Sequence, residues 1–383
     1  MIEAADRLTH VGEYFFSRKL KEIDILRQQG VDVINLGVGS PDLMPPELAI
    51  KAIEVASKGT ENHGYQSYVG LPELRNAIAS FYNRKYQIEL DFKSEILPMM
   101  GSKEAIMHVS LAYLNQNDKV LIPSLGYPTY TSVTKLVGAQ PIYYPLMEDN
   151  NWEPDWNFFE SLNWKGIKLL WLNYPHMPTG ATGSIEVMTR LVELAKKYDV
   201  LLCHDNPYSF ILNEKPLSIF SVAGAKEVAI ELNSLSKTFN MAGWRVGWVC
   251  GHADFLANIL KVKSNMDSGM FKPVQLGAIE ALNTSEEWFL ANNIEYKDRQ
   301  KLAFQLMTLI KATFSHQQAG MFVWGKISED AASFSEKLLE ETGVFMTPGI
   351  IFGEPGRFYI RISLCIKQER LKEAISRIEE NFK

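Results

Sequence analysis

The sequence predicts an α/β fold: a large, mostly parallel sheet covered by helices on both faces, joined to a smaller α+β domain. The first observation is a series of short, uninterrupted apolar runs, which are typical of strands buried on both faces. These runs lie near 96–100, 119–122, 168–172, 200–204, 228–232 and 246–250. Amphipathic segments with apolar residues at helical spacing lie between them, as at 103–114 and 185–198. Such alternation favours a parallel sheet.

The second observation is a change of character after about residue 275. A long helical segment is predicted over 275–314. Short strands with helices between them follow, in the segments GMFVWGKI, GVFMTPG and RFYIRISLC. This mixture predicts the smaller α+β domain.

Composition sets the outer bounds of the prediction. The chain has 383 residues, of which 46% are hydrophobic and 22% charged, so it is long enough for two globular domains. A net charge of −6 gives no basic surface for nucleic acid. The first residues carry charges and no long apolar run, which predicts neither a signal peptide nor a membrane span.

The cysteines and histidines add two further expectations. Cys203, Cys250 and Cys365 all lie in apolar stretches, so we expect buried, reduced thiols in a cytoplasmic protein. The seven histidines show no ligand spacing, and no catalytic metal is expected.

The stretch VAIELNSLSKTFNMAGWRVGW is the most informative for chemistry. Lys237 follows an apolar run, and a desolvated lysine has a lowered pKa and is a nucleophile toward aldehydes. Ser234, Ser236 and Arg245 supply two hydroxyls and a guanidinium, which suit a phosphate dianion. An aldehyde that carries a phosphate is pyridoxal 5′-phosphate, the cofactor that this cluster predicts. The alternative is a surface lysine after a turn.

Two upstream segments agree with this interpretation. Asp205 ends an apolar run in VLLCHDNPY, where a carboxylate could keep a pyridine nitrogen protonated, and the phenol of Tyr208 could bond the ring's 3-oxygen. A solvated Asp-Asn-Pro turn is the alternative. Gly101, Ser102 and Lys103 open a helix, where backbone N–H groups can bind an anion. The alternative there is an ordinary N-cap at Ser102.

In this order the motifs resemble a known family, the fold-type I pyridoxal-phosphate enzymes of the class I/II aminotransferase branch. The matching segments are INLGVGSPD, YQSYVGLPELR, MGSKEAI, GYPTY, MPTG, DNPY and SLSKTFNMAGWRVG. The resemblance runs from about Asn35 to Arg361 and implies a seven-stranded sheet. It also implies a large cofactor-binding domain over 46–274, with residues 1–45 and 275–383 forming a small domain that closes over the site.

The resemblance assigns a role to each matching residue. Lys237 would bind the cofactor as a Schiff base and then move the substrate proton, while Asp205 pairs with the ring nitrogen and Tyr208 with the 3-oxygen. Tyr127 would stack on the ring. The phosphate would be held by Gly101, Ser102, Lys103, Ser234, Ser236 and Arg245.

Three further residues match positions outside this cofactor set. Tyr65 resembles the tyrosine that reaches the neighbouring subunit's cofactor, which implies a homodimer. Arg361 matches the arginine that grips the substrate carboxylate, and Gly39 matches a backbone position beside it. For Arg361 the alternative is a solvent-facing residue on a strand.

One position departs from the family pattern. Asn usually precedes Pro-Thr-Gly and bonds the 3-oxygen, but NYPHMPTG places Met177 there, with His176 before it and Asn173 four residues back. Met cannot donate a comparable hydrogen bond. The pKa of the Schiff base between the cofactor and Lys237 should therefore be higher. His176 either compensates or is an ordinary loop histidine with its own partners.

The predicted function is a dimeric aminotransferase that moves an amino group between an α-amino acid and a 2-oxo acid in a ping-pong cycle. The alternative enzymes are a β-eliminating lyase or a decarboxylase, because the same residues would serve them. A regulatory module that carries this domain is a third possibility. It is disfavoured because family-like sequence begins by about residue 34, which leaves no room for a DNA-binding domain.

Overall fold

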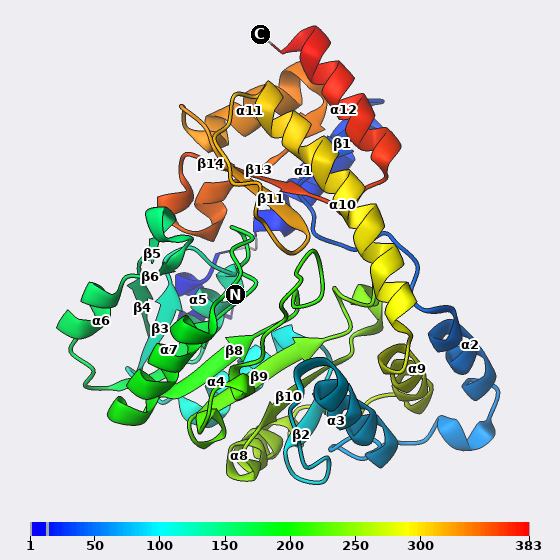
Figure 1. Ribbon diagram of the computed structural model, residues 1–383, viewed down its shortest axis with the longest axis vertical. Helices are drawn as coiled ribbons and strands as arrows, with labels where there is room; N and C mark the ends of the chain where they lie inside the picture. Colours follow the sequence, from blue (N-terminus) through cyan, green and yellow to red (C-terminus); the bar gives the residue numbers. More distant parts are fainter. Residues whose placement is uncertain (1, 13–14, 383) are drawn as a thin grey trace.

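The computed structural model describes residues 2–12 and 15–382, and its largest element is a seven-stranded sheet (Figure 1). The strand order is β2-β10-β9-β8-β7-β3-β4. Only β10 runs antiparallel to its neighbours, so the sheet is mostly parallel as predicted. The strands are β2 (Ile96–Met99), β3 (Lys119–Pro123), β4 (Gln140–Tyr144), β7 (Ile167–Leu172), β8 (Leu201–Asp205), β9 (Ala229–Ser234) and β10 (Gly247–Gly251).

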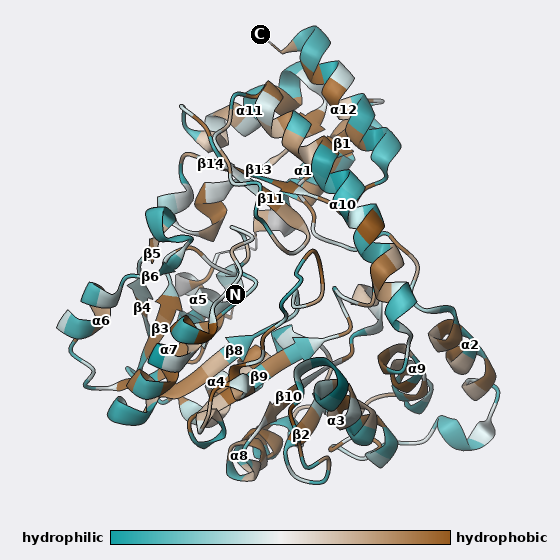
Figure 2. Ribbon diagram, in the orientation of Figure 1, coloured by the Kyte–Doolittle hydropathy of each residue, from teal (hydrophilic) through white to brown (hydrophobic). Residues whose placement is uncertain are grey.

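Helices cover both faces of this sheet, which is why its strands are apolar throughout. In β7, Leu169 and Trp171 pack on the side of α4 and α8, whereas Leu170 and Leu172 pack on the side of α7. Brown colouring accordingly dominates β3 and much of β8 and β9 (Figure 2). The helices of this part are α2 (Glu47–Ala56), α3 (Pro72–Tyr86), α4 (Ser102–Tyr113), α5 (Pro128–Leu136), α6 (Trp156–Ser161), α7 (Ile185–Tyr198) and α8 (Ala253–Lys263), with a short hairpin of β5 (Leu146–Met147) and β6 (Glu153–Pro154).

Helix α7 illustrates how local sequence sets these boundaries. The side chain of Ser184 caps the first turn by accepting from the Val187 amide, and Asp199 ends the helix in the left-handed conformation. Two lysines in the last turn complement the negative end of the helix dipole. The predicted range of 185–198 is therefore confirmed.

A second set of elements lies at the other end of the molecule in Figure 1. It contains a three-stranded antiparallel sheet, β11-β14-β13, and a parallel pair in which the N-terminal strand β1 joins β12. The strands are β1 (Ile34–Asn35), β11 (Phe322–Lys326), β12 (Val344–Phe345), β13 (Thr347–Pro348) and β14 (Tyr359–Ser363). The helices are α1 (Phe15–Gln28), α10 (Glu286–Leu309), α11 (Ala331–Thr342) and α12 (Gln368–Asn381).

The prediction of one long helix over 275–314 is wrong. The chain forms α9 (Lys272–Leu282) and then α10, which ends at Leu309. The backbone N–H of Asn283 closes the end of α9, and Ser285 is the N-cap residue of α10. Polar side chains such as those of Asn-Thr-Ser compete with helical hydrogen bonds, which explains the break.

The cysteines agree in part with expectation. None of the three forms a disulfide, and Cys203 and Cys250 are fully buried. Cys365 is only partly buried, because it follows the end of β14, with its thiol close to Met321. Within residues 2–12 and 15–382, no helix has both the length and the apolar character that a membrane crossing requires.

Candidate active site

The main candidate site is a cavity of about 490 Å³ between the large sheet and the β11-β14-β13 sheet. Strand β8 ends in it at Asp205 and β9 at Ser234, so the cavity lies at the carboxyl ends of parallel strands. Most of the predicted site residues line it: Gly39, Ser102, Lys103, Tyr127, Asp205, Tyr208, Ser234, Ser236, Lys237, Arg245 and Arg361. Gly101 lies against Arg245 at its edge.

Lys237 lies in the turn that follows β9. Its amine donates a hydrogen bond to the carbonyl oxygen of Gly39 at 2.5 Å. Burial lowers the pKa of Lys237, and the positive charges of Arg361 and Arg245 lower it further. The neutral, nucleophilic form of the amine is therefore more accessible here than in a solvent-exposed lysine.

Asp205 is buried rather than part of a solvated turn. Its Oδ2 accepts a hydrogen bond of 2.7 Å from the hydroxyl of Tyr130, while Oδ1 is buried and has no partner among the described residues. Burial raises the pKa of Asp205 to about 6, and the Tyr130 hydrogen bond opposes that rise. A buried acceptor of this kind fits a protonated ring nitrogen.

Tyr130 is a site residue that the sequence interpretation missed. Its ring stacks on Trp171 at a centroid distance of 5.0 Å and meets Tyr127 edge-on at 5.7 Å. The sequence offered one indication, because Tyr130 comes three residues after Tyr127, the N-cap residue of α5.

The start of α4 forms an anion cradle. Gly101 precedes the helix with φ of +89°, and a Cβ there would overlap the guanidinium of Arg245. Ser102 is the first helical residue and not the N-cap, and its buried hydroxyl has no hydrogen-bond partner in the described chain. The Arg245 guanidinium donates to the Met100 carbonyl at 3.1 Å, so its charge lies beside the exposed N–H groups of the helix.

The remaining hydroxyls and rings border this cradle. Ser234 and Ser236 are buried in the turn after β9, where the Ser236 amide points to the Ser234 hydroxyl at 3.4 Å. Lys103 has a lowered pKa because of burial and the nearby charge of Arg245. Burial raises the pKa of Tyr208, whose ring meets Phe322 edge-on at 6.0 Å.

Arg361 is a buried residue of β14, so the alternative of a solvent-facing side chain is wrong. Its guanidinium lies over two rings, 3.8 Å from the centre of Phe322 and 4.6 Å from that of Phe352. It also donates to the carbonyl oxygen of Gly37 at 2.7 Å. These contacts fix a cation at the mouth of the cavity, where it can bind a carboxylate.

The segment after β7 contains Met177, the residue that departs from the family pattern, and its neighbours His176 and Asn173. Met177 lines the cavity, and its sulfur lies 3.3 Å from an Arg361 nitrogen. Both ring nitrogens of His176 have partners, Thr179 at 2.8 Å and the Leu125 carbonyl at 3.0 Å, and burial lowers the pKa of His176 to about 4. His176 is thus an ordinary loop histidine. Asn173 is also occupied, because it accepts from the Met177 amide.

Tyr65 does not reach this cavity within one chain. Its side chain is 93% exposed. This position is compatible with the prediction that it serves a neighbouring subunit, which the single chain does not test.

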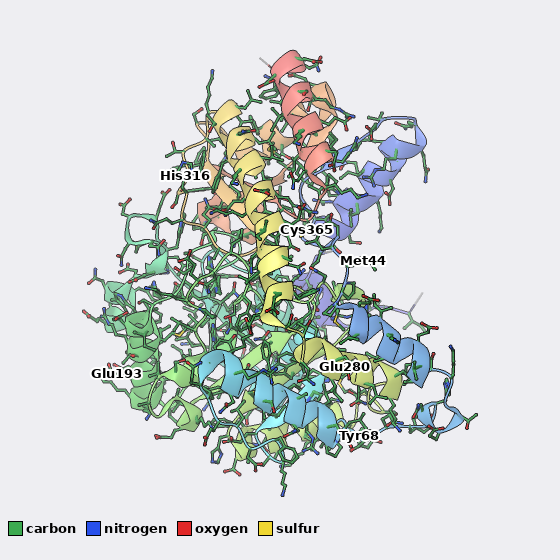
Figure 3. The ribbon with its side chains drawn as sticks, turned by 45° about the vertical axis from the view of Figure 1, so that its right-hand side comes forward. Met44, Tyr68, Glu193, Glu280, His316 and Cys365 are labelled. Atoms are coloured by element: carbon green, nitrogen blue, oxygen red, sulfur yellow. The ribbon has the colours of Figure 1, made fainter. Side chains whose placement is uncertain are left out.

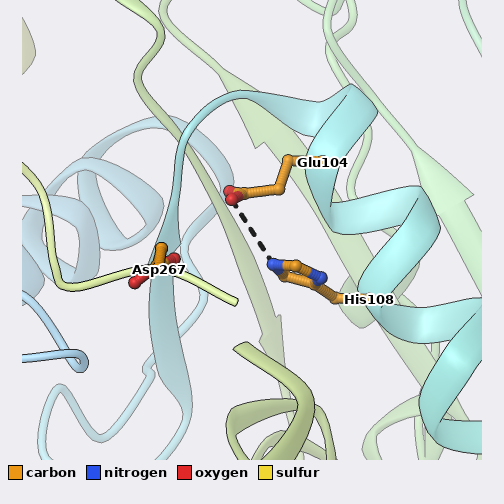
Figure 4. Close-up of side chains that lie close together, drawn as sticks. All are labelled: Glu104, His108 and Asp267. Atoms are coloured by element: carbon orange, nitrogen blue, oxygen red, sulfur yellow. Dashed lines mark ion pairs between the residues drawn. The ribbon is translucent and has the colours of Figure 1, made fainter. Parts of the chain in front are cut away.

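One group of possible metal ligands lies elsewhere, formed by Glu104, His108 and Asp267 (Figure 4). Their ligand atoms lie within 4.8 Å of one another. The ammonium of Lys263 already pairs with Asp267 at 2.6 Å, and Glu104 accepts from the Met100 amide at 2.5 Å. Glu104 therefore holds the chain that leads into the anion cradle, and Asp267 already has a cationic partner.

These features fit pyridoxal phosphate at both ends. One cavity brings together a desolvated lysine, a buried carboxylate oxygen and an anion cradle with a buried hydroxyl, and neither oxygen has a partner among residues 2–12 and 15–382. The fold and the site define a pyridoxal-phosphate-dependent enzyme.

Comparison with known proteins agrees. The model of the aminotransferase class I and II family matches residues 31–378. The chain belongs to this family.

Several relatives match over nearly the whole length. The LL-diaminopimelate aminotransferase of Maridesulfovibrio salexigens is 41% identical, with 98% of each chain covered. That of Aquifex aeolicus is also 41% identical, with 99% of each chain covered. Among solved structures, substrate-bound BacF from Bacillus subtilis superposes with a TM-score of 0.94 at 31% identity, covering 99% of this chain and 98% of that one.

The function of the chain follows from these relatives and the site. It is a pyridoxal-phosphate-dependent aminotransferase. The expectation from sequence is confirmed, and a lyase or decarboxylase activity is not favoured.

Proposed function

We propose that the amino donor of this enzyme is LL-diaminopimelate. The observation that carries the proposal is full-length similarity to aminotransferases named for this substrate. LL-diaminopimelate has an amino-acid group at each end, so a specific enzyme must bind charged groups away from the reacting carbon.

We further propose that the cofactor is held as the family resemblance implies. The phosphate would be bound by Ser102, Ser234, Ser236, Arg245 and the backbone N–H groups of Gly101 to Lys103. Asp205 Oδ1 would accept a hydrogen bond from the ring nitrogen, supported by its burial without a partner. Tyr208 would bond the 3-oxygen, and Tyr127 would lie against the ring. When bound, the cofactor supplies the aldehyde and an electron-accepting ring.

Lys237 is proposed as the catalytic residue. Burial lowers the pKa of its amine, so Lys237 could attack the cofactor's aldehyde and, once released, could take the proton from the substrate α-carbon. The carbonyl of Gly39 holds the amine at 2.5 Å and gives it a fixed direction. The same amine would then hold that proton for its return.

Arg361 is proposed to bind the substrate α-carboxylate. Two aromatic rings hold its planar guanidinium in one orientation, which suits a bidentate pair with a carboxylate. Gly39 would approach the same carboxylate by its backbone. The ring of Phe322 packs so close to Gly39 that a Cβ there would overlap it, which is why this position suits glycine.

The domain division is also a proposal. Residues 46–274 would form the large domain, and residues 1–45 and 275–383 the small one. Pairing of β1 with β12 supports the assignment of the N-terminal segment to the small domain. Gly39 and Arg361 would then move together when the small domain closes and excludes water.

A homodimer is proposed from an exposed apolar surface along α2 and the segment just before it. Met44, Tyr68 and Glu280 lie along this side of the molecule (Figure 3). Large side chains gather there, with exposures of 71% for Met44, 61% for Leu48 and 63% for Val55. Tyr65 and Phe271 are exposed on neighbouring segments. A surface of this kind is typical of a subunit interface.

We place the enzyme in the cytoplasm, where its three unpaired cysteines would stay reduced.

Mixed dimers test the shared site. We expect Lys237→Ala and Tyr65→Ala chains each to be inactive or strongly impaired alone. If Tyr65 serves the partner's cofactor, a mixed dimer contains one site with both native residues, and activity returns. No recovery, with mixed dimers demonstrated by two affinity tags, would contradict the sharing.

A donor panel tests the substrate. We expect kcat/KM for LL-diaminopimelate to exceed that for L-lysine, which lacks the distal carboxylate, by at least about a hundred-fold. Equal or better use of another amino acid would refute this substrate and leave the aminotransferase assignment intact.

A further inference from the structure

A buried pair of charged side chains, His204 and Glu231, lies on β8 and β9 next to Asp205. His204 precedes Asp205 on β8 and is paired in register with Glu231 on β9. Both side chains have no exposed surface. The His204 Nδ1 and Glu231 Oε2 atoms are 3.0 Å apart.

The hydrogen bonds of Glu231 define it as a carboxylate. The hydroxyl of Tyr82 donates to Oε1 at 2.7 Å, and the backbone amide of Ile219 donates to Oε2 at 2.9 Å. Trp248 points its indole N–H at the Tyr82 oxygen at 3.4 Å, which leaves the Tyr82 proton for Glu231. With donors on both oxygens, the ionised form is satisfied in the absence of solvent.

The partners of His204 then define its protonation. Its Nε2 lies 3.1 Å from the carbonyl oxygen of Tyr174, which can only accept, so Nε2 carries a proton. Nδ1 faces the ionised Glu231 and must donate as well. Both ring nitrogens therefore face acceptors, and this arrangement favours the imidazolium form of His204.

His204 adjoins two segments that line the active-site cavity. It is adjacent to Asp205 in the chain, and its charge lowers the Asp205 pKa against the effect of burial. Its acceptor, Tyr174, begins the segment that leads to Met177 in the cavity wall. Asn173 joins the same elements by donating to the Asp205 carbonyl at 2.7 Å.

We propose that the His204–Glu231 ion pair is a positioning element that keeps Asp205 ionised opposite the cofactor's ring nitrogen. The proposal rests on the proposed pairing of Asp205 with that nitrogen. His204 touches neither cofactor nor substrate and acts through Asp205. The titratable groups packed around the pair are Tyr82 and Tyr86 of α3, with Cys250 of β10 behind Glu231. None of these neighbours carries a positive charge, whereas the charge of His204 acts on Asp205.

The first test is direct observation of His204 in the holoenzyme. We would label histidine rings with ¹⁵N and assign His204 by its loss in His204→Gln and its change in Glu231→Gln. At neutral pH we expect both ring nitrogens of His204 to be protonated in the native enzyme and only one in Glu231→Gln. A singly protonated His204 in the native enzyme would overturn the proposal without reference to activity.

The second test measures the protonation of the cofactor's ring nitrogen. With ¹⁵N in the pyridine ring, the native enzyme should show a protonated ring nitrogen. In His204→Gln the shared proton should shift toward Asp205, and the signal should move toward that of the unprotonated ring. Tyr82→Phe is the matched control: it removes a neutral donor but leaves both charges, and its signal should stay native.

The two tests separate this proposal from the proposed function. An unchanged ring signal in folded His204→Gln would overturn the charge-holding role while transamination continues. If His204→Gln does not fold, Glu231→Gln provides the same comparison. Native-like kcat with an altered ring signal would show that the pair sets the charge but does not limit turnover, and so would support the proposal.

Discussion

The amine of Lys237 and the carbonyl oxygen of Gly39 lie 2.5 Å apart, which joins the turn after β9 to an N-terminal segment about 200 residues away. Two residues earlier in that segment, the Gly37 carbonyl accepts from Arg361 at 2.7 Å. One short stretch of backbone therefore holds the side chains of both Lys237 and Arg361.

Gly39→Ala should disturb both groups at once. A Cβ at this position would overlap the ring of Phe322, so either the segment or the ring that supports Arg361 must move. We expect steady-state kinetics to show a fall in kcat/KM of at least about ten-fold. Gly12→Ala is the control, because nothing lies within 4 Å of its added carbon. Native kinetics in Gly39→Ala would argue against a shared support.

Arg361→Lys keeps the charge but removes the bidentate fork. We expect kcat/KM for the amino donor to fall between about ten-fold and about a hundred-fold, mainly through KM, because one charge-assisted hydrogen bond is lost. Arg357→Lys is the matched control on an exposed arginine that pairs with Asp330 at 2.9 Å. Equal effects of the two substitutions on KM would refute a carboxylate role for Arg361.

Met177→Asn should restore a donor for the cofactor's 3-oxygen. An amide N–H stabilises the unprotonated phenolate, so the pH midpoint of the cofactor's visible absorption should fall by about half a unit to one unit. Spectrophotometric titration measures this midpoint. Met177→Leu has no donor and should not lower it. A fall in both variants would indicate a packing effect.

Asp205 should make the cofactor-free chain less stable as pH rises from about 4 to about 6. Burial raises the pKa of Asp205 from 3.8 to about 6, so in this window the folded chain binds a proton that the unfolded chain has released. The unfolding free energy of the native chain minus that of Asp205→Asn should fall by up to about 3 kcal/mol across the window and stay constant above it.

Denaturant titrations at several pH values measure this difference. Groups common to both proteins cancel, including His176, whose pKa is lowered to about 4. A difference that does not change with pH would show that Asp205 is not held in an apolar environment.

Much of the large sheet was predictable because burial on two faces leaves apolar runs in the sequence. Strand β4 was not predicted, because it is an edge strand with a proline and several partly exposed residues. The break between α9 and α10 was missed because apolar spacing continues on both sides of Asn283. A polar turn of three residues interrupts the helix without interrupting that pattern.

The site was predictable where chemistry requires one residue type, as at Lys237 and Asp205. It was not predictable where a role depends on contacts across the fold. Tyr130 orients Asp205 through a hydrogen bond between residues 75 positions apart. Phe322 and Phe352 hold Arg361 by lying over its guanidinium, and apolar residues on a strand give no sign of that in sequence.

The most direct test of the central assignment is a half-reaction of the purified holoenzyme with LL-diaminopimelate in the absence of any acceptor. We predict that one equivalent of amino donor converts the bound cofactor to its amine form, and that a 2-oxo acid restores the original spectrum. Lys237→Ala should show no such conversion on the same timescale. Release of ammonia and a keto acid without an acceptor, or a spectral change that no oxo acid reverses, would contradict an aminotransferase.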